Sequence, residues 1–426
     1  MTEGDSTRND KIFPKSFFWG ASTAAHQVEG GNVNQWSDWE LANARELAQT
    51  AEQRLGWLPS WGDIKAQAKT PENYVSGRGV DHYRLYKEDF DILQQLNMNA
   101  FRFGIEWSRI EPEEGVWDEA AIAHYRSYIQ ELQRRHIEPF ANLWHWTVPT
   151  WFAEKGGFKN KTNLHYFERF VQKIADELSE DLTYIITLNE PNVYTSFGYV
   201  TGEWVPEQRN IIAAARVYSN LVRAHKRAYK ILKDHKPELQ IGVAAQLSNM
   251  KAKRPRNIFD QIVTKMMRYG WNWWFLGRVR NQQDYVGLNH YFTDYCTGFF
   301  RQANPKKPVS DLGWYMEPEG LHLLLLQVWA RYKKPIIILE NGLADGNDKN
   351  RRWWLEKTIE AMQHALNDGV DIRGYLHWSL LDNFEWKYGW WPKFGLVEVD
   401  RENGMQRTVR PSAKWFAKRI KEITNS

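Results

Sequence analysis

Two short strings of this 426-residue chain each place one glutamate at the end of a hydrophobic run. They read TLNEP at 187–191 and ILENG at 338–342, and their glutamates are Glu190 and Glu340. The runs before them are rich in β-branched residues, which is typical of buried parallel strands. A glutamate where such a strand emerges is held on a rigid element and faces a cleft. Two carboxylic groups held in this way can act as the acid and the nucleophile on a single bond.

Eight strand-like segments occur along the chain, and each ends in polar or aromatic residues. Helix-like stretches separate them, and the one over 81–96 spaces Tyr83, Tyr86, Phe90 and Leu93 as one apolar stripe. Eight strand–helix repeats predict an α/β fold, a single-domain (β/α)8 TIM barrel whose active site lies at the C-terminal ends of the strands. The expected strands are Phe17–Thr23, Ala100–Glu106, Pro139–His145, Leu182–Glu190, Leu239–Gln246, Asp284–Tyr291, Pro335–Glu340 and Ile372–Ser379, and the longer expected helices are 81–96, 119–135, 163–179, 211–233, 319–332 and 353–367.

No Pro- or Ser-rich linker divides the chain, so we expect one domain over 12–426, after a flexible N-terminal segment over 1–11. That segment is polar and mixed in charge, and it lacks the apolar core of a signal peptide. No apolar run reaches the roughly 18 residues that a membrane span needs. Cys296 is the only cysteine, so no intrachain disulfide can form. These features predict a cytoplasmic protein without a membrane partner.

The composition is unusual in its 23 Trp, which accompany 19 Tyr and 20 Phe. Most of these rings belong in the core because they bury large areas, but the excess also suits a pocket that stacks flat rings such as sugars. The net charge is +4, with Lys and Arg mixed among Asp and Glu along most of the chain. An ordinary solvated surface explains this charge better than nucleic-acid binding does.

The longest stretch between expected strands is 32–78, which carries Trp36, Trp39, Trp57 and Trp61. Long loops after barrel strands usually build or cover the active site. We expect the tryptophans of this stretch to serve packing more often than sugar contact.

Polar side chains gather where the expected strands end, which on a barrel is one rim. Carboxylates, amides and imidazoles bond the hydroxyls of a carbohydrate, and Trp stacks on the apolar face of a pyranose. No phosphate-binding glycine loop or dinucleotide fingerprint follows a strand. His145 with His26 is a weak case for a metal, because no His/Cys cluster has metal-ligand spacing. The sequence therefore favours a sugar site with no metal and no cofactor.

Each of these candidates also has a structural interpretation. Glu190 before a proline can be a surface carboxylate at a strand end, and the Asn-Gly pair after Glu340 favours a turn. Arg102 can serve a structural ion pair, and His145 and Trp146 can be core residues. The order of the two glutamate strings along the expected barrel favours the functional interpretation of the glutamates.

The chain resembles glycoside hydrolase family 1, the β-glucosidase family, from Phe17 to Pro411. Five pieces of sequence that occur in the family's order carry the resemblance, and together they are not expected by chance. The pieces are FWGAS at 18–22 with QVEG at 27–30, FRFGIEWSR at 101–109, TLNEP at 187–191, ENG at 340–342 and WSLLDNFEW at 378–386.

The resemblance implies a retaining glycosidase with two glutamates in defined roles. Glu340 matches the family's nucleophile, which forms a covalent glycosyl-enzyme, and Glu190 matches the general acid/base, which protonates the leaving oxygen and then activates water. Arg102 matches an arginine that keeps the nucleophile ionised, and Tyr291 matches a tyrosine that hydrogen-bonds it, with Asn289 nearby. Glu190 is then expected to have a raised pKa, because the site is dry and Glu340 is charged.

The same match implies a set of sugar contacts. Asn189 is expected to bond the 2-hydroxyl, Trp378 to form the stacking floor and Trp314 to form the aromatic wall of the leaving-group site. The other expected sugar-binding residues are Gln27, His145, Trp146, Glu385 and Trp386.

Glu385 indicates the substrate class within this family. Members that cleave 6-phosphoglycosides lack an acid at this position, because an acid repels a sugar phosphate, whereas it can bond the free 4- and 6-hydroxyls. We therefore expect a β-glucosidase that acts on small, unphosphorylated β-glycosides or oligosaccharides, with β-galactosides or β-fucosides as further substrates. Two alternatives stay open: a transglycosylase that uses the same intermediate, and a catalytically silent sugar-binding barrel.

Overall fold

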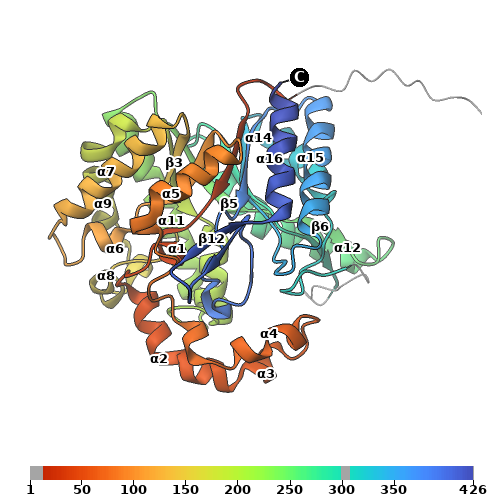
Figure 1. Cartoon of the computed structure of the whole chain (residues 1–426), viewed down its shortest axis with the longest axis horizontal. Coiled ribbons are helices and arrows are strands. Elements are labelled where there is room, and N and C mark those ends of the chain that lie inside the picture. Colours follow the sequence, from red (N-terminus) through yellow and green to blue (C-terminus); the bar gives the residue numbers. More distant parts are fainter. Residues whose placement is uncertain (1–12, 299–307, 426) are drawn as a thin grey trace, which may run out of the picture.

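A computed structural model describes residues 13–298 and 308–425, so the expected N-terminal segment 1–11 lies outside the described residues. Eight parallel strands close into a barrel in the order β1-β10-β9-β7-β5-β4-β3-β2. Each strand falls on one of the eight expected segments, and the predicted α/β TIM barrel is confirmed (Figure 1). The barrel strands are β1 Phe18–Ser22, β2 Ala100–Gly104, β3 Glu138–Asn142, β4 Tyr184–Asn189, β5 Gln240–Gln246, β7 Val286–Asn289, β9 Ile336–Asn341 and β10 Ile372–Trp378.

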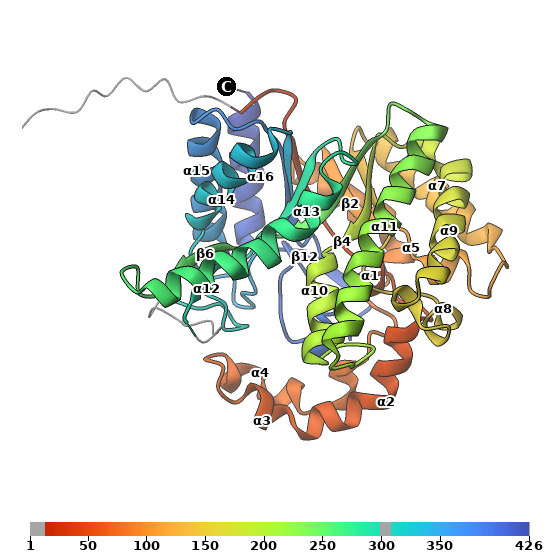
Figure 2. The same ribbon diagram turned by 180° about the vertical axis from the view of Figure 1, so that it is seen from behind.

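Helices surround the barrel on its outside (Figures 1 and 2). The expected helices appear with ends shifted by no more than two residues. On α5, Tyr86, Phe90 and Leu93 are buried as the stripe predicts, whereas Tyr83 is only half-buried, with its ring 4.1 Å from the Arg109 guanidinium. The helices of the outer layer are α5 His82–Gln95, α7 Glu119–Arg134, α9 Leu164–Leu178, α11 Ile211–His235, α13 Trp274–Val279, α14 Gly320–Tyr332, α15 Arg351–Asn367 and α16 Pro411–Thr424.

Further short elements decorate the ends of the barrel. Two strands, β6 and β8, pair in parallel, and β11 pairs with β12 as an antiparallel hairpin. One longer helix, α12, follows β6 and projects outward from the barrel (Figures 1 and 2). These elements are α1 Ala25–Val28, α6 Trp107–Ile110, α8 Thr150–Glu154, α10 Pro191–Thr195, the π-helical turn Ser196–Thr201, β6 Asn249–Ala252, α12 Ile258–Arg268, β8 Thr293–Cys296, β11 Val397–Asp400 and β12 Gln406–Val409.

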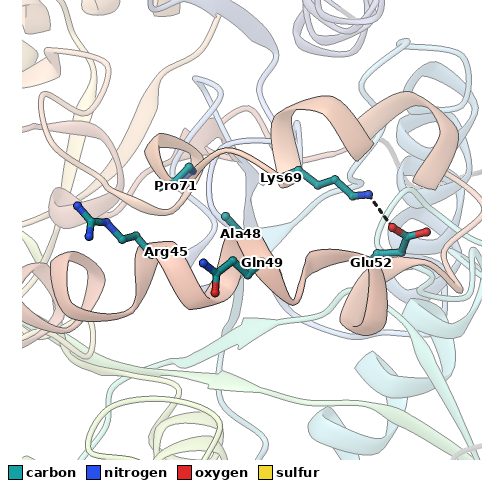
Figure 3. A pocket seen from close by; sticks show the side chains of 6 residues that line it. All are labelled: Arg45, Ala48, Gln49, Glu52, Lys69 and Pro71. Atoms are coloured by element: carbon teal, nitrogen blue, oxygen red, sulfur yellow. Dashed lines mark hydrogen bonds and ion pairs between the residues drawn. The ribbon is translucent and has the colours of Figure 1, made fainter.

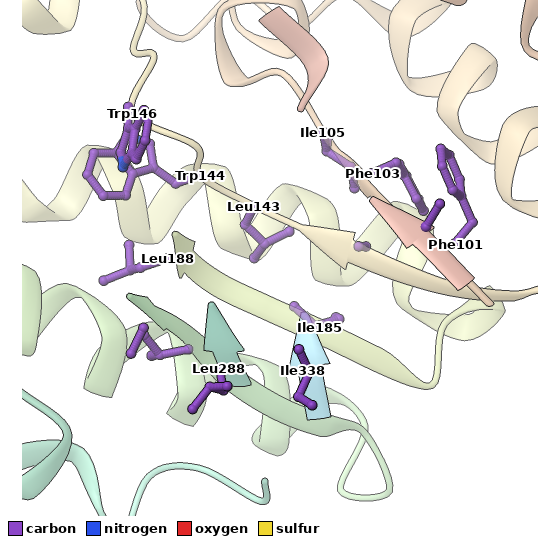
Figure 4. Close-up of a cluster of buried hydrophobic side chains, with 14 of the residues drawn as sticks. Phe101, Phe103, Ile105, Leu143, Trp144, Trp146, Ile185, Leu188, Leu288 and Ile338 are labelled. Atoms are coloured by element: carbon purple, nitrogen blue, oxygen red, sulfur yellow. The ribbon is translucent and has the colours of Figure 1, made fainter. Parts of the chain in front are cut away.

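Alternation along the strands divides the core into two layers. On β2, Phe101 and Phe103 pack in the large cluster between the barrel and the helices, with Ile185 and Ile338 of other strands (Figure 4). Because side chains alternate along a strand, Arg102 between the two phenylalanines points into the barrel. The barrel interior is filled by bulky side chains, as this fold requires. They include Phe140, Ile186, Tyr285, Ile337, Leu339 and Leu376.

Both glutamate-bearing strands lose regular pairing just before the glutamate. Between β4 and β5 the register passes from Ile186 to Asn189 with a shift, and between β7 and β9 it shifts before Glu340. An extra residue of this kind turns the side chains that follow it. As a result Leu339 packs inside the barrel while the next residue, Glu340, reaches the cavity above.

The long stretch 32–78 folds into helices that lie across one end of the barrel (Figure 1). The first of them starts with a capping box, in which Asn34 accepts from the Ser37 N–H and Ser37 accepts from the Asn34 N–H. No helix of the described residues combines the length and the apolar character needed to cross a bilayer. The helices of this stretch are α2 Gln35–Gln49, α3 Ala51–Leu55 and α4 Trp61–Ala68, followed by the 3-10 turn Pro71–Tyr74.

Close backbone approach beside Glu340 generates a first prediction. A Cβ on Gly342 would lie 1.7 Å from the carbonyl oxygen of Trp378, which is backbone and cannot move aside cheaply. We expect Gly342→Ala to destabilise the protein by about 1–3 kcal/mol, measured as a lower midpoint of thermal unfolding. Gly62→Ala on α4 is the control, because its Cβ would meet nothing within 4 Å. Equal midpoints for the two variants would contradict this account.

Candidate active site

One cavity of about 900 Å³ opens where the barrel strands end, and it contains both Glu190 and Glu340. Three other predicted residues, Arg102, Asn189 and Asn289, are fully buried and bond to residues of the cavity wall or to one another. The structure therefore brings the whole predicted set together. The predicted residues that line the cavity are Gln27, His145, Trp146, Glu190, Tyr291, Trp314, Glu340, Trp378, Glu385 and Trp386.

Glu340 is held on both sides of its carboxylate. The buried Arg102 guanidinium donates through Nη1 to one oxygen, and the Tyr291 hydroxyl donates to the other at 2.6 Å. Burial and the charge of Glu340 raise the pKa of Tyr291 well above its usual value, so the phenol keeps its proton and remains a donor. A carboxylate with two fixed donors, one of them cationic, has little freedom to turn. Its position is therefore set before a ligand arrives.

Glu190 is buried and has a strained backbone. Its backbone is left-handed, with φ of 42°, although it is not a glycine, and Pro191 follows it at the first turn of α10. Residues held in such conformations cluster at functional sites. Its carboxylate accepts one hydrogen bond from the Asn289 amide at 2.8 Å. Burial and the negative charge of Glu340 raise the pKa of Glu190 well above its usual value, although the Asn289 bond and Arg102 act in the opposite direction.

Amides connect the two carboxyl groups beneath the cavity. The Asn189 side-chain oxygen accepts from Arg102 Nη2 at 2.7 Å and from Asn289 Nδ2 at 3.2 Å. Its nitrogen lies 3.0 Å from Nε2 of His145. Burial and the nearby Arg102 lower the pKa of His145 well below its usual value, so the imidazole is neutral and can accept this N–H. One continuous network thus links the environments of Glu190 and Glu340.

A third carboxyl group, Glu385, also lines the cavity. It accepts from Asn383 Nδ2 at 3.1 Å and from Gln27 Nε2 at 3.4 Å. Burial is the main reason that the pKa of Glu385 rises to about 8, and the charge of Glu340 adds to the rise. The buried Oε1 of Gln27 has no partner among the described residues, so it is free to accept a ligand hydroxyl.

Aromatic rings form much of the remaining wall. The Trp386 ring lies 4.9 Å from the Trp146 ring and 4.8 Å from Trp36, and it is nearly parallel to His26 at 5.6 Å. Trp378 is stacked against His145, 5.8 Å away. Elsewhere on the wall, the rings of Tyr291 and Trp314 meet edge to face at 5.6 Å. Trp36 therefore packs behind the cavity residue Trp386, as expected for the tryptophans of the stretch 32–78, while Trp57 lines the cavity itself.

Several cavity residues were not expected from the sequence. Gln246 ends β5 and accepts a hydrogen bond from the indole of Trp271, so the rule that strand ends form the site could have found it. Glu203 and Trp204 come from the connection between α10 and α11, and the Trp204 ring lies 4.8 Å from the Trp146 ring. No periodicity marks this connection, so no sequence signal pointed to these two.

A second, smaller hollow lies among the helices of the stretch 32–78 (Figure 3). It encloses about 470 Å³ and is lined by residues of α2 and α3, among them Arg45 and Gln49, and by Lys69 and Pro71 after α4. Its one ion pair joins the exposed Lys69 and Glu52 at 2.6 Å. Among the residues that the structure describes, no group of three or more His, Cys, Asp or Glu side chains could hold a metal ion.

The cavity combines groups that can act on a bond between a sugar and its substituent. A protonated carboxyl group can give a proton to a leaving oxygen, and a fixed carboxylate can attack carbon. Flat rings, amides and a third carboxyl group can hold a polyhydroxylated ring between them.

Comparison with known proteins points to the same chemistry. The sequence profile of Glycosyl hydrolase family 1 matches residues 9–286 and 276–424. The β-glucosidase A of Thermotoga maritima is 30% identical, over 97% of this chain and 98% of the relative. The β-galactosidase of Sulfolobus acidocaldarius is 28% identical, over 97% of this chain and 95% of the relative.

Solved structures with the same fold are also similar over their whole length. The β-glycosidase from Pyrococcus horikoshii superposes with a TM-score of 0.84 at 31% identity, covering 97% of this chain and 95% of that one. The β-glucosidase from Thermotoga maritima in complex with glucoimidazole has a TM-score of 0.84 at 27% identity, covering 97% and 99%.

The electrostatic link between the two glutamates can be tested without any substrate. Because the charge of Glu340 helps to raise the pKa of Glu190, Glu340→Gln is expected to lower the pKa of Glu190. NMR titration of selectively labelled glutamate carboxyls measures this shift. Glu385→Gln is the matched control, since the charge of Glu385 is a smaller cause of the same rise. An unchanged titration of Glu190 in Glu340→Gln would show that the two groups are independent.

Proposed function

The chain belongs to glycosyl hydrolase family 1, and we propose that it is a retaining β-glycosidase that releases terminal β-D-glucosyl residues from unphosphorylated glycosides. That it is a family 1 glycosidase follows from the profile match and the relatives. One observation carries the proposed mechanism: the two buried carboxyl groups of one cavity have different partners. Glu340 is held by a cation and a phenol, whereas Glu190 accepts one bond from an amide and has a raised pKa.

In the first step Glu340 attacks the anomeric carbon with a lone pair of its carboxylate. The bond from that carbon to the leaving oxygen breaks, and Glu190 gives its proton to this oxygen. The products are a glycosyl ester on Glu340 and a free alcohol. Charge on Glu340 disappears in this step, so the pKa of Glu190 falls and the group is ready to act as a base.

In the second step Glu190 takes a proton from water, and the water oxygen attacks the anomeric carbon. The ester bond to Glu340 breaks, and the sugar leaves with the configuration it had in the substrate. Asn289 serves both steps, because its amide holds Glu190 and also contacts Asn189.

The sugar itself is proposed to lie against the floor of Trp378, with its hydroxyls bonded by the polar wall. Asn189 bonds the 2-hydroxyl, a contact that strengthens in the transition state. Glu385 and Gln27, which already contact each other, bond the hydroxyls at the other end of the ring. Trp314 borders the place of the leaving group. The other proposed sugar contacts are His145, Trp146 and Trp386.

The relatives named above include both a β-glucosidase and a β-galactosidase. We propose that this chain accepts glucosides and, with them, galactosides or fucosides. Glu385 accepts hydrogen bonds and, with a pKa of about 8, can also donate one at neutral pH, so it can serve either arrangement of the 4-hydroxyl.

The roles of the two glutamates can be separated by rescue. Glu340→Ala is expected to abolish turnover of nitrophenyl β-glucoside. In Glu190→Ala the rate of hydrolysis should fall by roughly 10²–10⁴, and azide should partly restore it. Azide can attack the glycosyl-enzyme without a base, and the nitrophenol needs little protonation. Release of nitrophenol measures both.

Glu88→Ala on α5 is the control, since Glu88 is exposed on the outer layer. The retaining mechanism also requires that NMR of the first-formed sugar shows the β-anomer. Inverted product, or wild-type protein that releases no nitrophenol from any β-glycoside, would sink the proposal. Transfer of the sugar to an alcohol instead of water would favour the transglycosylase alternative.

The substrate class depends on Glu385. Glu385 repels a phosphate dianion when it is ionised and offers it no positive charge when it is protonated, so kcat/KM for nitrophenyl β-glucoside is expected to exceed that for its 6-phosphate by orders of magnitude. Glu385→Ser should lower kcat/KM on the glucoside and reduce the ratio of kcat/KM between the glucoside and its 6-phosphate. A higher kcat/KM on the phosphorylated substrate in the wild type is the result that contradicts this assignment.

A further inference from the structure

Helix α12 exposes an apolar stripe that the fold does not use. Ile258, Phe259, Ile262 and Met266 are between 48% and 68% exposed, and Tyr269 just beyond the helix is 52% exposed. Among the described residues, no other helix exposes as many large hydrophobic side chains. Scattered exposed hydrophobics are ordinary on a protein surface, but a contiguous set indicates an interaction site.

The stripe is outward-facing because the opposite side of α12 is firmly attached. Asp260 is buried and accepts from the Arg254 guanidinium at 2.8 Å and from the Gly298 N–H at 2.8 Å. Val263 and Thr264 are buried beside it, and Asn257 caps the first turn. The helix therefore presents one face to the protein and leaves its apolar stripe to the surroundings.

Positive charge is concentrated around this stripe. The segment 249–271 contains six Lys and Arg residues and one acidic residue, a net charge of 6 − 1 = +5, whereas the whole chain has +4. Two of the six cations are already paired, Arg254 with Asp260 and Lys251 with Glu317 from outside the segment. Lys253, Arg256 and Lys265 are exposed. An outward apolar face flanked by Lys and Arg is the pattern of a helix that lies on an anionic lipid surface.

The stripe adjoins the mouth of the active-site cavity. Met267 of the same helix, with Gly270 and Trp271 after it, lines the cavity wall. Trp57 also lines the cavity and is 70% exposed, so its indole ring lies in solvent at the edge of the cavity. Indole rings favour the boundary between water and an apolar phase. Apolar surface thus runs along α12 to the entrance of the site.

We propose that α12 docks on an anionic lipid surface and that the natural substrates are amphiphilic β-glycosides, whose apolar aglycone leaves the cavity beside α12. This proposal rests on the proposed function for its chemistry. It departs from the expectation of no membrane partner, which rested on the lack of a spanning segment and did not consider a helix lying in the interface. A second copy of the chain is a poorer occupant, because it would bring two such basic segments together.

Vesicle sedimentation with the full chain tests the docking. Wild-type protein is expected to bind phosphatidylcholine vesicles that contain phosphatidylserine and to bind pure phosphatidylcholine more weakly. Phe259→Ser and Ile262→Ser should each weaken binding by about tenfold, since each removes an apolar side chain from the interface. Lys265→Glu should weaken it by about tenfold on the anionic vesicles only.

Matched controls lie on the outer helices. Leu323→Ser on α14 removes another exposed apolar side chain, and Lys414→Glu on α16 makes the same change of charge. Neither should affect vesicle binding. No wild-type binding to the anionic vesicles, or equal losses in the α12 and control variants, would overturn the proposal. So would a sedimentation velocity that shows a dimer broken by Phe259→Ser, because the stripe would then be a self-association surface.

Kinetics separate this proposal from the proposed function. The α12 variants should hydrolyse soluble nitrophenyl β-glucoside like the wild type, but they should lose kcat/KM on dodecyl β-glucoside carried in the anionic vesicles. Equal activity of wild type and α12 variants on the vesicle-bound substrate would overturn the docking alone. Absence of hydrolysis of the soluble substrate would instead overturn the proposed function, whatever the vesicles show.

Discussion

The buried guanidinium of Arg102 is the group on which the site depends. A cation inside a barrel is costly unless its donors are satisfied by fixed partners. Here the partners are Glu340, the proposed nucleophile, and the amide oxygen of Asn189. Removing one partner would leave a buried charge uncompensated, so the barrel holds Arg102, Glu340 and Asn189 as one unit. Asn289 extends that unit to Glu190 and thus connects both carboxyl groups through hydrogen bonds.

The backbone is irregular where this unit meets the cavity. The register shifts before both glutamates, and Glu190 has a left-handed backbone with φ of 42°. Such features cost stability, and a closed barrel with large aromatic and aliphatic clusters on both sides of its strands can carry them. The asymmetry between the carboxyl groups follows from the same arrangement, since Arg102 contacts only one of them directly.

The sequence predicts the elements better than their details. All eight barrel strands and the six expected helices fall where hydrophobic patterning places them, and the family resemblance is confirmed by the profile match. Arg102 was found because it stands within the FRFGIEWSR motif, and Asn289 because it stands at the end of an expected strand beside Tyr291. Residues that were missed, such as Glu203, come from irregular connections. Such connections have no hydrophobic periodicity from which the position of a side chain could be predicted. Neither the left-handed Glu190 nor the apolar stripe of α12 beside the cavity follows from pattern alone, because both depend on tertiary packing.

The central claim is that Glu340, held by Arg102 and Tyr291, becomes covalently bonded to the sugar. A dinitrophenyl 2-deoxy-2-fluoro-β-glucoside tests it most directly. The fluorine slows both formation and breakdown of the glycosyl-enzyme, whereas the good leaving group speeds formation alone, so the covalent intermediate accumulates. Mass spectrometry of the intact protein and its peptides should show one added fluoroglucosyl group, located on Glu340. A label on another residue, or complete turnover with no adduct and an α-configured product, would contradict the account.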